Sequence, residues 1–157
     1  MPENILEKII EKKIIKIDNL KKTLALESLK DIIDKNNTFL NFKEKIENNL
    51  KAQKFSIIAE IKKASPSAGV ILNNYDPVHI ANIYDKNKAT CLSVLTEEDF
   101  FLGNSLHITK IKEKINLPIL CKDFFIDKYQ VPLAKSYGAD AILIIMAGVS
   151  DLSLIHI

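Results

Sequence analysis

Four short apolar runs that alternate with helix-like segments constrain the fold of this chain most strongly. The runs occupy residues 55–62, 90–96, 118–122 and 140–147. Runs this short and apolar are typical of β-strands. Because parallel strands need long crossover connections, usually helices, the alternation predicts an α/β fold with a parallel sheet. The alternation alone leaves two architectures open, an open doubly wound sheet and a barrel.

Three amphipathic helices are predicted before the first strand, over residues 3–22, 26–35 and 40–50. Their apolar residues recur every three or four positions, with Lys and Glu between them. Such helices usually expose one polar face to water, so their lysines give no case for membrane binding. We expect residues 1–52 to form a helical extension and residues 53–150 to contain the sheet.

Helix boundaries are marked by residues that favour the ends of helices. Asp76 followed by Pro77 predicts a helix start, with Asp as N-cap and Pro at the first helical position. Ser105 and Asp127 are predicted to cap the next two helices. Gly138 fits the left-handed position that follows a helix end.

The composition excludes several classes of protein. The net charge is only +2, and all 22 basic residues are lysine, so bulk charge gives no case for nucleic acid. No apolar stretch approaches the roughly 18 residues of a spanning helix, and the amino terminus lacks a secretory apolar region. Cys91 and Cys121 lie within apolar runs and are predicted to be buried thiols. No metal-ligand spacing occurs. A cytoplasmic protein without a metal is expected.

Charged residues lie near the ends of the first and third apolar runs. Alternation along a strand places Glu60 and Lys62 on one face, and Lys122 ends the third run. The carboxyl ends of strands are where barrels carry catalytic groups. A buried Glu60–Lys62 ion pair is the alternative, but burying charge is costly. We favour a site for an anion, in which neighbouring ammonium groups make one lysine a better acid.

The loops after these runs supply further candidate binding residues. Ser65, Pro66 and Ser67 follow Lys62, and their hydroxyl and N–H groups could bind phosphate or carboxylate, although such a segment is also typical of a plain turn. Aromatic rings at a barrel mouth could hold a flat ring, while others join the core. Four candidates follow the second and third runs: Phe100, Phe101, Phe124 and Phe125.

Three motifs, in this order and at these spacings, resemble those of indole-3-glycerol phosphate synthase. They are Ile58–Ser67, Leu92–Glu98 with Phe101 and Gly103, and Pro118–Phe124. Tyr129–Gln130, the run Gly138–Asp140 and the amino-terminal helices are also similar, so the resemblance covers roughly residues 3–150. It implies a (β/α)8 TIM barrel preceded by extra helices, and a monomer for the full-length protein.

The resemblance implies a lyase, specifically a carboxy-lyase, of tryptophan biosynthesis. Its substrate would be the phosphorylated small molecule 1-(2-carboxyphenylamino)-1-deoxyribulose 5-phosphate, which closes to indole-3-glycerol phosphate with loss of CO2 and water. No cofactor is implied. Lys122 resembles the general acid, Lys62 the lysine that holds the anthranilate carboxylate, and Glu60 the carboxylate that positions that lysine. The implied substrate contacts are Ser65 at the phosphate loop and Phe101 and Phe124 beside the anthranilate ring.

Four strands are half of an eight-stranded barrel. The residues that the family carries on its later strands have no counterpart here, and the tail 151–157 fits the pattern poorly, which suggests truncation or foreign sequence. We therefore expect the chain as given to be inactive. Two other functions stay open, a non-catalytic half-barrel assembly module and another phosphate-binding barrel, such as a Schiff-base aldolase. The histidines are expected on the surface or in packing: His79, His107 and His156.

Overall fold

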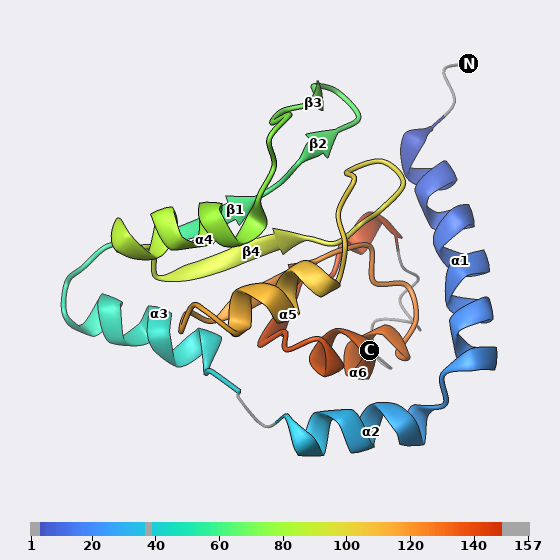
Figure 1. Ribbon diagram of the computed structural model, residues 1–157, viewed down its shortest axis with the longest axis horizontal. Coiled ribbons are helices and arrows are strands. Elements are labelled where there is room, and N and C mark those ends of the chain that lie inside the picture. The colour runs from blue at the N-terminus through green and yellow to red at the C-terminus, as the bar shows by residue number, and fades with distance from the viewer. Residues whose placement is uncertain (1–3, 37–38, 149–157) are drawn as a thin grey trace.

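A computed structural model describes residues 4–36 and 39–148, and it places three helices before a four-stranded parallel sheet (Figure 1). The predicted alternation of strands and helices is confirmed. None of the described helices is long and apolar enough to cross a membrane. The elements in chain order are α1 (Ile5–Thr23), α2 (Leu26–Lys35), α3 (Phe42–Lys51), β1 (Ile58–Ile61), β2 (Ala64–Ser65), β3 (Gly69–Val70), α4 (Pro77–Lys86), β4 (Cys91–Leu95), α5 (Leu106–Lys112), β5 (Ile119–Lys122), α6 (Gln130–Ser136), β6 (Ala141–Ile142) and a 3-10 turn (Met146–Gly148).

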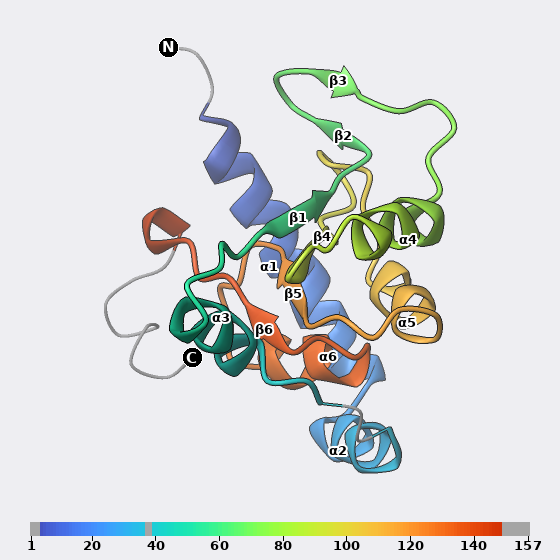
Figure 2. The same cartoon turned by 90° about the vertical axis from the view of Figure 1, so that its left-hand side faces the viewer.

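The strands pair in the order β1-β4-β5-β6, and every pair is parallel. Figure 2 shows the sheet curving from β1 to β6, with α4, α5 and α6 on its outer side. The register places Glu60 beside Ser93, and Leu95 beside Lys122. The carboxyl ends of the strands therefore meet at one edge, as the sequence pattern requires.

The main core lies between the sheet and its outer helices. Alternate residues of β1 and β5 enter this core, so Ile61 and Ile119 are fully buried, whereas Ile58 is 48% exposed on the opposite face. The predicted burial of both thiols is confirmed, and burial raises the pKa of Cys91 to about 11 and that of Cys121 to about 12. The helices contribute Ala81, Ile108, Ile111 and Ala134.

Most predicted helix boundaries are confirmed. Asp76 accepts hydrogen bonds from the N–H groups of Val78 and His79, and Pro77 begins α4. Ser105 precedes α5 directly, as predicted, but its side chain makes no cap hydrogen bond. The side chain of Asn104, one residue earlier, accepts from the Leu106 N–H group instead.

The strands are shorter than the apolar runs. β1 begins only at Ile58 because its pairing with β4 begins there, opposite Cys91. β6 contains two residues, since β5 pairs with it only at Leu120 and Cys121. A small antiparallel hairpin, β2–β3, occupies the segment predicted as a loop. The predicted tail at 151–157, with His156, lies outside the described residues.

The amino-terminal helices surround the sheet on its remaining sides. α1 lies across the carboxyl ends of the strands, and α3 lies near their amino ends (Figure 1). α2 packs on α6, where Leu29 is fully buried beside Tyr129. The Tyr129 hydroxyl donates a hydrogen bond to the Leu24 carbonyl at 2.8 Å. Long-range contacts of this kind fix the extension against the sheet.

Candidate active site

The carboxylate of Glu60 joins two lysines that come from different strands. Its Oε1 lies 2.7 Å from Lys62 Nζ, and its Oε2 pairs with Lys122 Nζ. All three side chains lie on the sheet face opposite the helix-packed core, and each is about one-third exposed, at 30–36%. The structure thus brings the three predicted catalytic residues together, where a ligand can reach them from the open face.

The two lysines control the charge of Glu60. Burial raises the pKa of this carboxyl, but hydrogen bonds from Lys122 and Lys62, together with their positive charges, outweigh burial and hold the pKa below its usual value. The cluster therefore carries one negative and two positive charges at neutral pH. The Glu60–Lys62 ion pair of the alternative interpretation does form, but it is only partly buried, and a second lysine shares the carboxylate.

Two predicted aromatic residues lie together beyond the strand ends. The rings of Phe101 and Phe124 have centroids 6.3 Å apart and are tilted by 41°. Phe125, in contrast, is buried in the core. The ring of Phe100 lies under Lys12 Nζ, 5.1 Å from its centroid. Phe101 and Phe124 therefore form an apolar surface near the strand ends, one from each loop.

Buried polar side chains hold both aromatic loops. Glu97 is 2% exposed, and its carboxylate accepts hydrogen bonds from the N–H groups of Asp99, Phe100 and Phe101 at 2.7–3.1 Å. The same loop requires glycine at position 103, because a Cβ there would lie only 2.5 Å from the Leu95 carbonyl oxygen. The role of Glu97 was not predicted, because nothing in the local sequence distinguishes a buried carboxylate from the other acidic residues of this loop.

The loop after β5 is held in a similar way. Gln130 is 6% exposed, and its Oε1 accepts from the N–H groups of Ile126 and Asp127, while its Nε2 donates to the Phe124 carbonyl. Asp127 caps the Tyr129 N–H group at 2.8 Å. These bonds fix the backbone at the residue that carries the Phe124 ring.

A largely buried ion pair involves Asp123, the residue that follows Lys122 in the chain. Asp123 Oδ1 is 2.6 Å from Lys13 Nζ, and the two side chains are only 13% and 7% exposed. Thr96 donates a hydrogen bond to Asp123 Oδ2 at 2.9 Å. A sequence signal for Lys13 does exist, because it falls midway between the buried Ile9 and Ile17, on the apolar stripe of α1.

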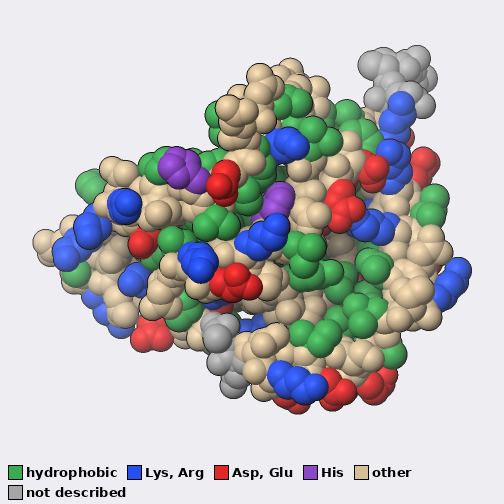
Figure 3. Space-filling model, viewed as in Figure 1, with side chains coloured by type: hydrophobic (Ala, Val, Ile, Leu, Met, Phe, Trp, Pro, Cys, Tyr) green, Lys and Arg blue, Asp and Glu red, His purple; other side chains and the backbone are tan. Residues whose placement is uncertain are grey.

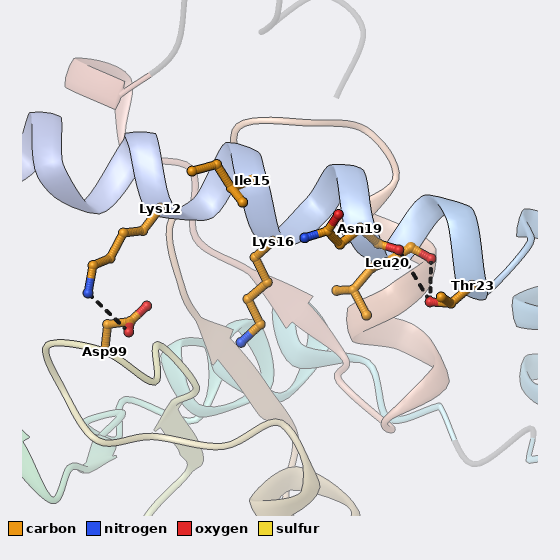
Figure 4. A pocket seen from close by; sticks show the side chains of 7 residues that line it. All are labelled: Lys12, Ile15, Lys16, Asn19, Leu20, Thr23 and Asp99. Atoms are coloured by element: carbon orange, nitrogen blue, oxygen red, sulfur yellow. Dashed lines mark hydrogen bonds and ion pairs between the residues drawn. The ribbon is translucent and has the colours of Figure 1, made fainter.

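Exposed ion pairs add to this contact between α1 and the loops. Lys12 pairs with Asp99 at 3.2 Å, Lys16 pairs with Glu98, and Lys21 pairs with Asp127 at 2.6 Å. A groove of about 550 Å³ runs along α1 beside these pairs, lined by residues from Lys12 to Thr23 and by Asp99 (Figure 4). The residues of the Glu60 cluster do not line this groove, which lies between α1 and the loop that carries Asp99.

The structure places the predicted phosphate contacts in the β2–β3 hairpin. Ser65 Oγ accepts a hydrogen bond from the Ala68 N–H group at 3.2 Å, and it lies 3.4 Å from Ser67 Oγ. Pro66 and Ser67 are exposed. No hydrogen bond joins these three residues to the Glu60 cluster within the described part of the chain. The hairpin extends beyond the end of β1, on the same side as the cluster's strand ends (Figure 1).

Comparison with known proteins gives one consistent result. The sequence model of the family described as indole-3-glycerol phosphate synthase matches residues 6–156. Proteins of that name from Microcystis aeruginosa and Trichodesmium erythraeum are each 44% identical, over 99% and 98% of this chain and 52% and 51% of their own lengths. One from Prochlorococcus marinus is 46% identical over 99% of this chain and 52% of its own length. The chain spans about half the length of the curated relatives it matches.

Proposed function

The chain belongs to the indole-3-glycerol phosphate synthase family, and on this premise we propose that its Glu60 cluster serves the family's ring closure. The reaction would convert 1-(2-carboxyphenylamino)-1-deoxyribulose 5-phosphate to indole-3-glycerol phosphate, CO2 and water. The observation that carries this proposal is the bridge from Glu60 to Lys62 and Lys122. Two ammonium groups on the open face of the sheet match a substrate with a carboxylate and a carbonyl.

The proposed roles follow from the charges of the three residues. The ring carbon that bears the carboxylate attacks the ketone carbon, and Lys122 donates a proton to the ketone oxygen as the bond forms. Loss of CO2 from that ring carbon restores the aromatic benzene ring. The methylene carbon beside the nitrogen then loses a proton, and the new hydroxyl leaves as water after protonation. Lys62 binds the substrate carboxylate and supplies the acid for this last step. Glu60 orients both ammonium groups through its two carboxylate oxygens.

The loops supply the proposed binding surface. Phe101 and Phe124 provide apolar contact for the anthranilate ring, and their backbones are fixed by Glu97 and Gln130. Rigid placement of this kind lowers the entropy cost of orienting the substrate. Ser65, with Pro66 and Ser67 beside it, is proposed to contact the phosphate from the hairpin.

The proposal extends to the organisation of the protein. We place the helical extension at residues 1–52 and the first half of the barrel at residues 53–150, with the protein acting as a cytoplasmic monomer on a small phosphorylated molecule. Neither nucleic acid nor a membrane is part of the proposal. It rests on the family relationship, on a net charge of only +2 and on four parallel strands that curve with helices outside.

The test joins this chain to the remaining half of the Microcystis aeruginosa relative and measures indole formation by fluorescence. We expect the chain alone to give no product and the fusion to be active. In the fusion, Lys122→Met should lower kcat by about 10²–10⁴-fold, as loss of a general acid does. Lys62→Met should raise KM and also lower kcat, because Lys62 is assigned both the substrate carboxylate and the acid of the dehydration step. The matched control Lys114→Met changes an exposed lysine away from the cluster and should leave both values unchanged.

Three results would contradict these expectations. An active fusion whose turnover survives Lys122→Met would remove the assigned acid. Trapping of a substrate adduct on Lys122 by borohydride would instead indicate an aldolase of the Schiff-base type. Product formation by the chain alone would show that the later strands of the family are not needed.

A further inference from the structure

A second polar cleft lies between α4 and α5, away from the Glu60 cluster. Its volume is about 560 Å³, within the range of roughly 300–1,000 Å³ that small-molecule sites occupy. Figure 3 shows this face of the molecule, on which histidine and charged side chains of both signs gather over α4 and α5. The polar side chains that matter here are Lys63, Tyr75, Asp76, His107 and Lys110.

Two buried atoms in this cleft have no hydrogen-bond partner among the described residues. They are Tyr75 Oη and His107 Nδ1. The two rings contact each other, with centroids 5.5 Å apart and a tilt of 55°, so they form one wall of the cleft. Buried polar atoms in native proteins almost always have a partner. The partner of these two atoms is therefore expected from outside the described residues, and a bound ligand would supply it.

The charges around the cleft indicate what that partner is. Burial lowers the pKa of His107, and the nearby charges of Lys110 and Lys63 lower it further, so its imidazole is neutral at pH 7. The Tyr75 hydroxyl can donate or accept, and Nδ1 of a neutral imidazole accepts or donates according to its tautomer. The carboxylate of Asp76 is already engaged at the start of α4. The two lysines remain as cations for an anionic ligand.

We propose that this cleft is a binding site for a small anion that carries a hydroxyl group, such as a hydroxy acid or a phosphorylated polyol. The ligand hydroxyl bonds to Tyr75 Oη and His107 Nδ1, because a hydroxyl both accepts and donates. The anionic group lies between Lys63 and Lys110. The proposal does not depend on the proposed ring closure, since none of the residues in the Glu60 cluster lines this cleft.

The test uses the chain labelled with ¹⁵N-histidine and glycerol 3-phosphate as the probe. The Nδ1 resonance of His107, assigned with His107→Gln, should shift saturably as the probe is added. The resonances of His79, which is exposed on α4, should not move. Glycerol lacks the anion and inorganic phosphate lacks the carbon-bound hydroxyl, so each should bind at least about ten-fold more weakly.

Variants distinguish a built site from general attraction. Lys110→Gln and Tyr75→Phe should each weaken binding by about ten-fold or more. Lys114→Gln removes a nearby charge that does not line the cleft and should change binding by less than about two-fold. Lys122→Gln should leave the His107 shift intact, which shows that the probe is not seated at the Glu60 cluster. Tyr75→Phe keeps the ring contact, so this variant is expected to fold.

Several results would overturn the proposal. One is no shift of His107 Nδ1 at about 10 mM probe, where a millimolar site would be mostly filled. Another is equal weakening by Lys110→Gln and Lys114→Gln, which would indicate nonspecific attraction. Undiminished binding by Tyr75→Phe would mean that water alone satisfies the hydroxyl. Loss of the shift in Lys122→Gln would place the probe at the other site.

Discussion

Replacing Glu97 by Gln should destabilise the chain more than its small chemical size suggests. The carboxylate is buried and accepts three backbone N–H groups. A hydrogen bond to a charged group contributes about 1.5–3 kcal/mol, so three bonds set an upper limit of about 4.5–9 kcal/mol. Gln keeps one oxygen, which can still serve two donors, but its amide points a donor at the third N–H group.

The expected cost for Glu97→Gln is therefore one lost bond, weaker neutral bonds in the other two and one unpaired buried donor, together about 2–4 kcal/mol. Urea unfolding of the chain measures it. With a slope near 2 kcal/mol per molar, the midpoint should fall by about 1–2 M. The neighbouring change Glu98→Gln affects an exposed ion pair and should cost less than about 1 kcal/mol.

A midpoint for Glu97→Gln no lower than that of Glu98→Gln would refute this reasoning. Amide hydrogen exchange adds a second check, because the N–H groups of Phe100 and Phe101 should exchange faster in the variant. If stability falls while these two amides keep their protection, the loss has another cause.

Three further predictions concern the pairs and thiols described above. Lys13→Met leaves Asp123 buried without its cation and should cost about 3–5 kcal/mol in urea unfolding, whereas the same change at an exposed lysine of α1 should cost under about 1 kcal/mol; equal costs would contradict the buried pair. The pKa of Glu60 in the folded chain is lowered from 4.5, so its contribution to the free energy of unfolding is present above pH 4.5 and is lost as pH falls through the folded pKa. Glu60→Gln should remove this part of the fall in stability at acid pH. An unchanged dependence of stability on pH below 4.5 would contradict the prediction. Because the pKa values of Cys91 and Cys121 are raised to about 11 and 12, mass spectrometry should show both thiols unreacted with iodoacetamide at pH 8 until urea unfolds the chain, and rapid alkylation of the folded chain would argue against their burial.

The sequence predicts those parts of the fold that local chemistry determines. α2 matches its predicted range of 26–35, and α4 begins at Pro77 because the Asp-Pro pair fixes its first turn. Strand ends are predicted less well, since pairing depends on a neighbour elsewhere in the chain. Residues 141–147 are uniformly apolar, yet only Ala141 and Ile142 have partners on β5.

In the candidate site too, local sequence predicts some features, whereas others depend on residues far away in the chain. Alternation along β1 and β5 is sufficient to place Glu60, Lys62 and Lys122 on one face, and the structure brings them into contact. The residues that support them depend on distant segments. Lys13 precedes its partner Asp123 by 110 positions, so the apolar stripe of α1 can indicate that Lys13 is buried but does not identify its partner. No local pattern can reveal such a contact.

The position of α1 has a consequence for the timing of assembly during synthesis. Lys16, Lys12 and Lys21 bond to residues that lie 82, 87 and 106 positions later. At about 5–20 residues per second, the 82 positions from Lys16 to Glu98 take a ribosome about 4–16 s to translate. An isolated helix forms in about a microsecond, so α1 can coil and uncoil many times before its docking surface exists. Of the described helices and strands, α1 is thus made before its partners and is among the last to be secured, and its apolar stripe stays exposed until then.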